Sequence, residues 1–145
     1  DSIDLVITDL LDPEMEYTGK DIENWPYYYS KTSGKRYYCD NKENCFIDDE
    51  NVIPVTKHFY FGWKNAFKVG AYDEEGNLRE VGRVASGLSD ELREDIAANP
   101  DNYLGNCVQL SCMSVNSKDM TIRHPVFECM RYDKNPQECL IAEIF

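Results

Sequence analysis

The stretch 52–87 is the clearest β region of this chain, and it constrains the fold more than any other segment. In AFKVGAY, apolar side chains alternate with polar or small ones, which is the period of two that a half-buried strand requires. DEEGN then forms a turn in which Gly76 can adopt a positive φ angle, and LREVGRVAS returns as the partner strand. Gly70 and Gly82 inside the two strand patterns indicate bulges or sharp bends. The sequence therefore predicts a curled hairpin of the kind that a small barrel contains.

A helix follows this hairpin. Ser89 is a good N-cap, and the two acidic residues after it suit the positive end of the helix dipole. Leu88, Leu92 and Ile96 form an apolar stripe at a spacing of four, and Asn99-Pro100 ends the helix. We therefore predict one helix from Ser89 to about Ala98.

Three further strand regions complete the pattern. IDLVIT at 3–8 is rich in β-branched residues, CVQLSCMSV alternates with Val108, Leu110 and Cys112 on one face, and PVFECMRYDK starts out extended. A turn at 116–119, the returning MTIR and a short helical turn at NPQEC fill the remainder. About five strands with one helix between the third and fourth predict a mainly β fold, a five-stranded OB-fold barrel.

A long insertion follows the first strand of this barrel. Residues 10–56 are mostly polar, but YYYSKTSGKRYYC contains two tyrosine clusters around a glycine-containing turn, which predicts a hairpin. We expect residues 1–145 to form a single OB-fold domain with this segment as an insertion. Because the chain starts inside a strand pattern, we also expect it to be a fragment of a longer protein.

The charge of the chain limits its partners. A net charge of −12 argues against nonspecific binding to nucleic acid, so any phosphate contact must come from a local basic patch or from another part of the protein. No apolar run is long enough to cross a bilayer. We expect a cytoplasmic protein without membrane contacts, of bacterial or phage-like intracellular origin, and a monomer.

The six cysteines and two histidines of the chain are the residues that could bind a transition metal. No C-x-x-C pair occurs, and the histidines lie far apart, so we predict no metal site. Reduced intracellular thiols are favoured, with Cys112 as a buried thiol in a strand. The alternative is a disulfide, for which Cys39 and Cys45 are the best pair.

The end of the chain carries the residues best suited to chemistry. Arg131 can bind phosphate oxygens with two parallel hydrogen bonds, Lys134 adds a compact charge, and Asp133 can orient either cation. Such a group suits a polyphosphate better than the edge of a base. The alternative is a solvated cluster of surface ions.

These residues stand in a wider pattern. Arg131-x-Asp133-Lys134 is similar to the R-x-D-K motif of the nucleotidyltransferase superfamily, and RHPVF before it and VGRVASGLSDEL upstream resemble the C-terminal OB-fold domain of ATP-dependent DNA ligases. DSIDLVIT resembles the strand that follows the K-x-K motif of the catalytic domain. Together these segments span nearly the whole chain. The family's K-x-D-G and K-x-K motifs are absent, and the segment 10–54 is longer than the family pattern accommodates.

The resemblance implies a function in DNA replication, repair and recombination. Arg131, Asp133 and Lys134 would orient the β- and γ-phosphates of ATP, with Mg²⁺, while a nucleotidyltransferase domain of the same polypeptide supplies the lysine that becomes adenylylated. The OB domain would then contact nicked duplex DNA during sealing. Without the nucleophilic lysine, this chain alone should be inactive.

Several basic residues are candidates for the contact with DNA, and two other functions stay open. The candidates are Arg83, Arg123, Lys31, Lys35 and Arg36, the last three interleaved with tyrosines in a way that suits a nucleic-acid backbone. The alternative for this hairpin is that its tyrosines only cover apolar surface. The alternative functions are the OB domain of an RNA ligase or mRNA capping enzyme, which shares R-x-D-K, and a non-catalytic OB binding module.

Overall fold

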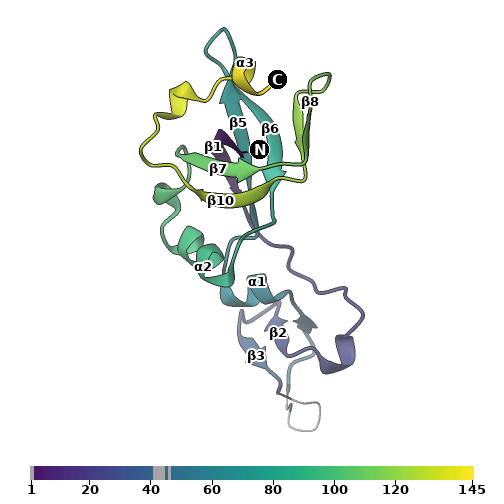
Figure 1. The fold of residues 1–145 in the computed structure, drawn as a ribbon. Coiled ribbons are helices and arrows are strands. Elements are labelled where there is room, and N and C mark those ends of the chain that lie inside the picture. The colour runs from purple at the N-terminus through teal and green to yellow at the C-terminus, as the bar shows by residue number, and fades with distance from the viewer. Residues whose placement is uncertain (1, 41–44, 46) are drawn as a thin grey trace. The chain divides into compact units, whose positions relative to one another are not determined.

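The computed structural model describes residues 2–40, 45 and 47–145 (Figure 1). The chain forms two compact units: unit 1 comprises Asp1–Leu11 and Lys64–Phe145, and unit 2 comprises Asp12–Trp63. Unit 2 overlaps the segment 10–56 that the sequence marks as an insertion and extends beyond it to Trp63. No helix of the described residues is both long and apolar enough to cross a membrane.

Unit 1 contains a five-stranded antiparallel sheet. Its strands follow the order β10-β7-β1-β5-β6, and they are β1 (Ser2–Leu11), β5 (Ala66–Tyr72), β6 (Leu78–Val84), β7 (Cys107–Ser111) and β10 (Val126–Met130). The helix α2 (Asp90–Ala98) lies between the third and fourth of these strands in chain order, so the predicted mainly β class and its element order are confirmed.

Closure of this sheet is partial. A single isolated parallel bridge between Ser86 and Val126 joins the chain after β6 to β10, and the amide of Phe127 donates to the Ser86 carbonyl at 2.9 Å. The two outer strands of the sheet form no ladder with each other among the described residues. Among the described residues the sheet is therefore not closed into the expected barrel, although OB-fold barrels can be partly open.

The core of unit 1 lies on the sheet and under α2. Three consecutive residues of the central strand β1, Leu5 to Ile7, are buried, so both faces of this strand are covered. Burying each large aliphatic or aromatic side chain stabilises the fold by about 1.5–3 kcal/mol. Other fully buried members are Phe67, Val69, Val81, Val84, Ile96, Val108 and Leu110.

The helix α2 begins and ends as the sequence predicts. The Ser89 side chain accepts a hydrogen bond from the Leu92 amide at 3.1 Å, and Asn99 is the C-cap. Arg93 then fixes the helix to the sheet, since its guanidinium donates to the Asn65 carbonyl and, at 3.1 Å, to the Ala85 carbonyl. The predicted apolar stripe packs on the core of unit 1: Ile96 belongs to the core, and Leu88 and Leu92 pack against it.

The bulge predicted in the β5–β6 hairpin is confirmed. The register shifts between Val69 and Gly70, which pair with Gly82 and Glu80. A Cβ at Gly70 would lie 2.4 Å from the Arg79 carbonyl oxygen, so only glycine fits there. A Cβ at Gly82 would lie 2.6 Å from the side chain of Ile122.

Short elements complete unit 1. The predicted turn at 116–119 connects β8 (Ser114–Asn116) and β9 (Thr121–Arg123), which form a separate two-stranded hairpin. The helical turn expected in NPQEC is the 3₁₀ helix η4 (Pro136–Glu138). Two further short helices, η3 (Pro100–Asn102) and α3 (Ile141–Ile144), were not predicted.

Unit 2 contains the tyrosine-rich hairpin that the sequence predicts. The strands β2 (Tyr27–Ser30) and β3 (Arg36–Tyr38) pair antiparallel, and Gly34 in their turn has a φ of 76°. A third strand, β4 (Val52–Pro54), extends the sheet to the order β3-β2-β4. The 3₁₀ helix η1 (Ile22–Asn24) precedes β2 in the chain. The prediction of this hairpin is confirmed.

The assignment of the whole stretch 52–87 to β structure is wrong for one segment, because Lys57–Phe61 forms the helix α1. Thr56 caps its start by accepting a hydrogen bond from the Phe59 amide at 3.3 Å. Gly62, with a φ of 74°, ends it. The capping residues at both ends stabilise a helix in a run whose aromatic residues favour strands.

The aromatic residues of unit 2 pack largely on one another. The Tyr27 ring contacts Tyr38, Tyr60 and Phe61 at centroid distances of 4.8–5.7 Å. Trp25 stacks on Tyr17, and its indole donates to the carbonyl of the fully buried Val55 at 2.7 Å. Such packing supplies the core that this short segment needs.

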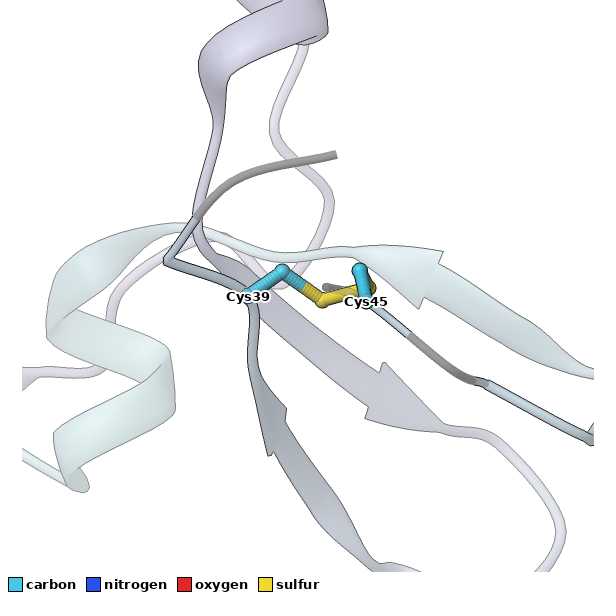
Figure 2. The surroundings of a disulfide bond; sticks show 2 residues. All are labelled: Cys39 and Cys45. Carbon is cyan, nitrogen blue, oxygen red and sulfur yellow. A yellow bond between two sulfur atoms is a disulfide. The ribbon is translucent and has the colours of Figure 1, made fainter. Parts of the chain in front are cut away.

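Figure 2 shows the disulfide between Cys39 and Cys45 in unit 2, whose Cα atoms are 5.0 Å apart. The prediction that all cysteines are reduced thiols is therefore wrong. The disulfide forms at Cys39 and Cys45, the pair that the sequence analysis gave as the alternative. Cys112, expected to be buried, is only half-buried. The buried thiols are instead those of Cys107 and Cys139, whose sulfur atoms lie 3.3 Å apart.

Candidate functional site

The R-x-D-K residues follow directly after β10 and form a turn next to β7. The Arg131 amide donates to the Cys107 carbonyl at 2.8 Å, which continues the pairing of β10 with β7 by one residue. The Lys134 amide donates back to the Arg131 carbonyl at 3.2 Å. This turn places both cationic side chains on the same part of the sheet.

Every nitrogen of the Arg131 guanidinium has an acceptor. Nε and Nη2 donate to the two carboxylate oxygens of Asp133 at 3.0 Å each, a bidentate pair. Nη1 lies 3.4 Å from Oδ2 of Asp4 and 3.3 Å from Oε1 of Gln109. The arginine is therefore held both by its own turn and by the sheet.

Lys134 reaches the same carboxylate. Its Nζ lies 3.3 Å from Oδ2 of Asp4, so this one oxygen receives both cations. The side chains of Arg131 and Lys134 are 33% and 20% exposed, so neither is fully buried. With two carboxylates and two cations, the four-residue cluster of Asp4, Arg131, Asp133 and Lys134, here called the Asp4 cluster, has no net formal charge.

The pKa values in the Asp4 cluster reflect these pairs. The hydrogen bonds and charge of Asp133 raise the pKa of Arg131, and Arg131 lowers the pKa of the Asp133 carboxyl. Burial lowers the pKa of Lys134, but the hydrogen bond and the charge of Asp4 outweigh it, so that this pKa is raised. Both cations are therefore charged at neutral pH.

Asp4 and Gln109 were not predicted to belong to the site. They are partners in the β1–β7 ladder, which places their side chains next to each other below the turn. The signal for Asp4 was a carboxylate inside the otherwise apolar strand IDLVIT. Gln109 carries no comparable signal, since a polar residue at every second position of a strand is common.

A small cavity lies beside Lys134 and Asp4. It has a volume of about 190 Å³ and is lined by Ser2, Ile3, Asp4, Lys134, Leu140, Glu143 and Ile144. Two members of the Asp4 cluster, Asp4 and Lys134, therefore line a hollow at the surface of unit 1, next to α3.

The basic residues expected to contact DNA lie on different units. Arg83 on β6 and Arg123 on β9 are exposed in unit 1. Lys31, Lys35 and Arg36 are exposed in the β2–β3 hairpin of unit 2. Lys35 lies 4.9 Å from the centre of the Tyr37 ring, and Arg36 donates to the Tyr60 carbonyl at 2.9 Å.

The cysteines near the Asp4 cluster differ strongly in expected reactivity. Burial, followed by the neighbouring Cys107, raises the pKa of Cys139 to about 12, and burial also raises the pKa of Cys107, whereas Cys129 is exposed. At pH 8 the thiolate of a group with such a pKa is on the order of one in ten thousand. We expect iodoacetamide to modify Cys129 in the native protein and to spare Cys107 and Cys139, as measured by peptide mass spectrometry.

The control for this labelling is the same reaction in denaturant without a reductant. There all four free cysteines should react, while Cys39 and Cys45 stay protected by their disulfide. Native labelling of Cys139 as fast as that of Cys129 would contradict the burial of the Cys107–Cys139 pair.

No model of a protein family matches this chain, and no curated protein matches it. Among solved structures, one named Pmar-Lig_PreS3 is 19% identical with a TM-score of 0.47, and one named Pmar-Lig_Pre. is 18% identical with a TM-score of 0.43. Each match covers 90% of this chain, and the chain spans only 21% of the length of either structure.

Proposed function

We propose that this chain is the OB-fold domain of an ATP-dependent DNA ligase, and that Arg131 and Lys134 bind the β- and γ-phosphates of ATP. The observation that carries the proposal is the convergence of both cations, at 3.4 and 3.3 Å, on one carboxylate oxygen. Two donors that meet at one oxygen of a carboxylate can meet equally at the oxygens of a phosphate. The order of the motifs along the sequence, which resembles that of the ligase domain, supports the same assignment.

The chemistry assigned to these residues is electrostatic. When a lysine attacks the α-phosphorus of ATP, the bond to the bridging oxygen breaks and pyrophosphate leaves with the negative charge. Arg131 and Lys134 neutralise and orient this leaving group, which is the main contribution that protein groups make to such transfers. Asp133 keeps the guanidinium plane in position through its bidentate pair.

The remaining parts of the reaction belong to other components. The attacking lysine and most of the ATP site come from a nucleotidyltransferase domain of the same polypeptide, so the chain alone is inactive. The described residues contain no group of three or more His, Cys, Asp or Glu that could hold a metal ion. We assign Mg²⁺ to the phosphates and mainly to that other domain, with the β- and γ-phosphates presented to the Asp4 cluster.

Contact with nicked duplex DNA is assigned to the basic side chains of both units. Arg83 lies on β6 and Arg123 on β9. These two strands lie close together where the side chain of Ile122 approaches Gly82. Lys31, Lys35 and Arg36 supply a second basic group in unit 2. These side chains would bind the phosphate backbone, which fixes position on the duplex without reading its sequence.

The proposal is tested by adding the chain in trans to a ligase nucleotidyltransferase domain that lacks its own OB domain. We expect the addition to raise the rate at which the catalytic lysine is adenylylated by labelled ATP, because only the complete pair neutralises the leaving pyrophosphate. The Arg79→Ala variant is a charge-matched control, since Arg79 pairs with Asp73 and not with the Asp4 cluster. If the wild-type chain leaves adenylylation unchanged, the proposed function is wrong.

A further inference from the structure

The two carboxylates of the Asp4 cluster are held in different ways. Asp133 belongs to the same turn as both cations, and its side chain is 70% exposed. Asp4 belongs to β1, which is paired on one side with β7 and on the other with β5. Its side chain is only 18% exposed. Asp4 is therefore the carboxylate of the cluster that the sheet itself holds in place.

The position of Asp4 Oδ2 resembles that of a bound phosphate oxygen. It accepts from an Nη1 of arginine at 3.4 Å and from an ammonium at 3.3 Å. Without the Asp4 carboxylate, the like charges of Arg131 and Lys134 would repel each other across the position that Oδ2 now occupies. One carboxylate oxygen thus keeps the guanidinium and the ammonium together in the absence of a ligand.

The same contact opposes binding of a polyphosphate. A phosphate oxygen that binds both cations at the point where they converge takes the place of Asp4 Oδ2, and its negative charge is repelled by that carboxylate. The cavity of about 190 Å³ beside Asp4 and Lys134 gives an anion access to this contact. Binding must therefore displace Lys134, Arg131 or both from Asp4.

From this geometry we infer that Asp4 is a positioning residue that acts as an internal substitute for the phosphate. It holds Arg131 and Lys134 side by side in the free protein, and it is exchanged for a phosphate oxygen when a polyphosphate binds. The inference rests on the proposed function, because it concerns the same pair of cations. It adds that the free site is self-neutralised, and that the affinity for phosphate is set partly by a competing group of the protein.

The test is titration of the 145-residue chain with inorganic triphosphate at low salt, followed by calorimetry. Asp4→Asn keeps the size of the side chain and one acceptor oxygen but removes the charge. We expect it to bind triphosphate about tenfold more tightly than the wild type, because a repelling charge next to the ligand is lost. Arg131→Ala and Lys134→Ala should bind more weakly.

Glu143→Gln is the matched control. Glu143 lines the same cavity, and its substitution makes the same change in net charge without touching the contact to the cations. It should change the affinity much less than Asp4→Asn does. An equal effect of the two substitutions would show that only the general charge matters, and would overturn the role of Asp4.

Other outcomes separate the inference from the proposed function. If wild-type binding depends on Arg131 and Lys134 but Asp4→Asn binds no more tightly, the inference is wrong and the phosphate site stands. If binding is absent, or is unaffected by Arg131→Ala and Lys134→Ala, the inference fails, whereas the proposed function is decided separately by the adenylylation experiment with the nucleotidyltransferase domain. Should Asp4→Asn not fold, judged by circular dichroism, Asp4→Thr provides the same comparison with a side chain that suits a strand.

Discussion

Replacing Gly87 with alanine is expected to lower the free energy of unfolding of unit 1 by about 2–5 kcal/mol. Gly87 has a φ of 82°, which L-residues adopt only with strain. A Cβ there would also lie 2.7 Å from the Phe127 carbonyl oxygen and 2.9 Å from a methyl carbon of Val126. The added methyl would therefore push β10 away from the Ser86–Val126 bridge that joins the two edges of the sheet.

Gly76→Ala is the matched control for this prediction. Gly76 also has a φ of 82°, but a Cβ there has nothing within 4 Å. Its substitution should cost only about 1–2 kcal/mol, the backbone contribution alone. The difference between the two variants measures the crowding at β10, and equal losses would contradict it.

The measurement must follow unit 1 specifically. Both tryptophans lie in unit 2, so tryptophan fluorescence reports on that unit and serves as an internal control. Amide hydrogen exchange in β7 and β10 reports on unit 1. We expect Gly87→Ala to accelerate exchange in these strands and to leave the fluorescence transition unchanged.

The second large effect concerns the phosphate role of Arg131. In the adenylylation reaction with a nucleotidyltransferase domain, Arg131→Ala should reduce the rate on the order of 100-fold, as expected for the loss of one group that stabilises developing charge. The backbone contact of residue 131 with Cys107 does not depend on the side chain, so the turn should persist. Activity equal to that of the wild type would contradict the assigned role.

Arg131→Lys separates charge from geometry. Lysine keeps the positive charge but cannot form the bidentate pair that Arg131 makes with Asp133 at 3.0 Å, nor present a planar fork to phosphate. We therefore expect this variant to recover little of the lost rate. Full recovery would mean that a point charge suffices at this position. The thermal stability of both variants should change little, since partly exposed ion pairs contribute little to stability.

Elements with local signals were predictable from the sequence. The helix α2 carries its N-cap at Ser89 and its stop at Asn99-Pro100, and the β5–β6 hairpin has its turn glycine at Gly76. In both cases the information lies within a few residues of the element. The sequence of α1 also has caps, at Thr56 and Gly62, but its aromatic residues suggested a strand.

The Asp4 cluster shows why the rest was not predictable. Arg131, Asp133 and Lys134 stood out because they are close in sequence, whereas Asp4 lies at the other end of the chain. Its contact with Lys134 exists because β7 pairs with β1 on one side and β10 on the other. Strand order of this kind depends on packing across the whole sheet, which no local pattern encodes. The buried pair of Cys107 and Cys139 was missed for the same reason.

The place where unit 2 is inserted also affects how unit 1 folds. Leu11 and Ala66 are ladder partners in β1 and β5, and the Asn65 amide donates to the Leu11 carbonyl at 2.9 Å. Two strands that a turn of roughly four residues could connect are thus separated by residues 12–65, and closing this longer loop costs about 2 kcal/mol more entropy. If unit 2 becomes ordered first, it shortens the effective loop and much of that cost disappears. The kinetics with which the central strand pair nucleates are therefore coupled to the folding of unit 2.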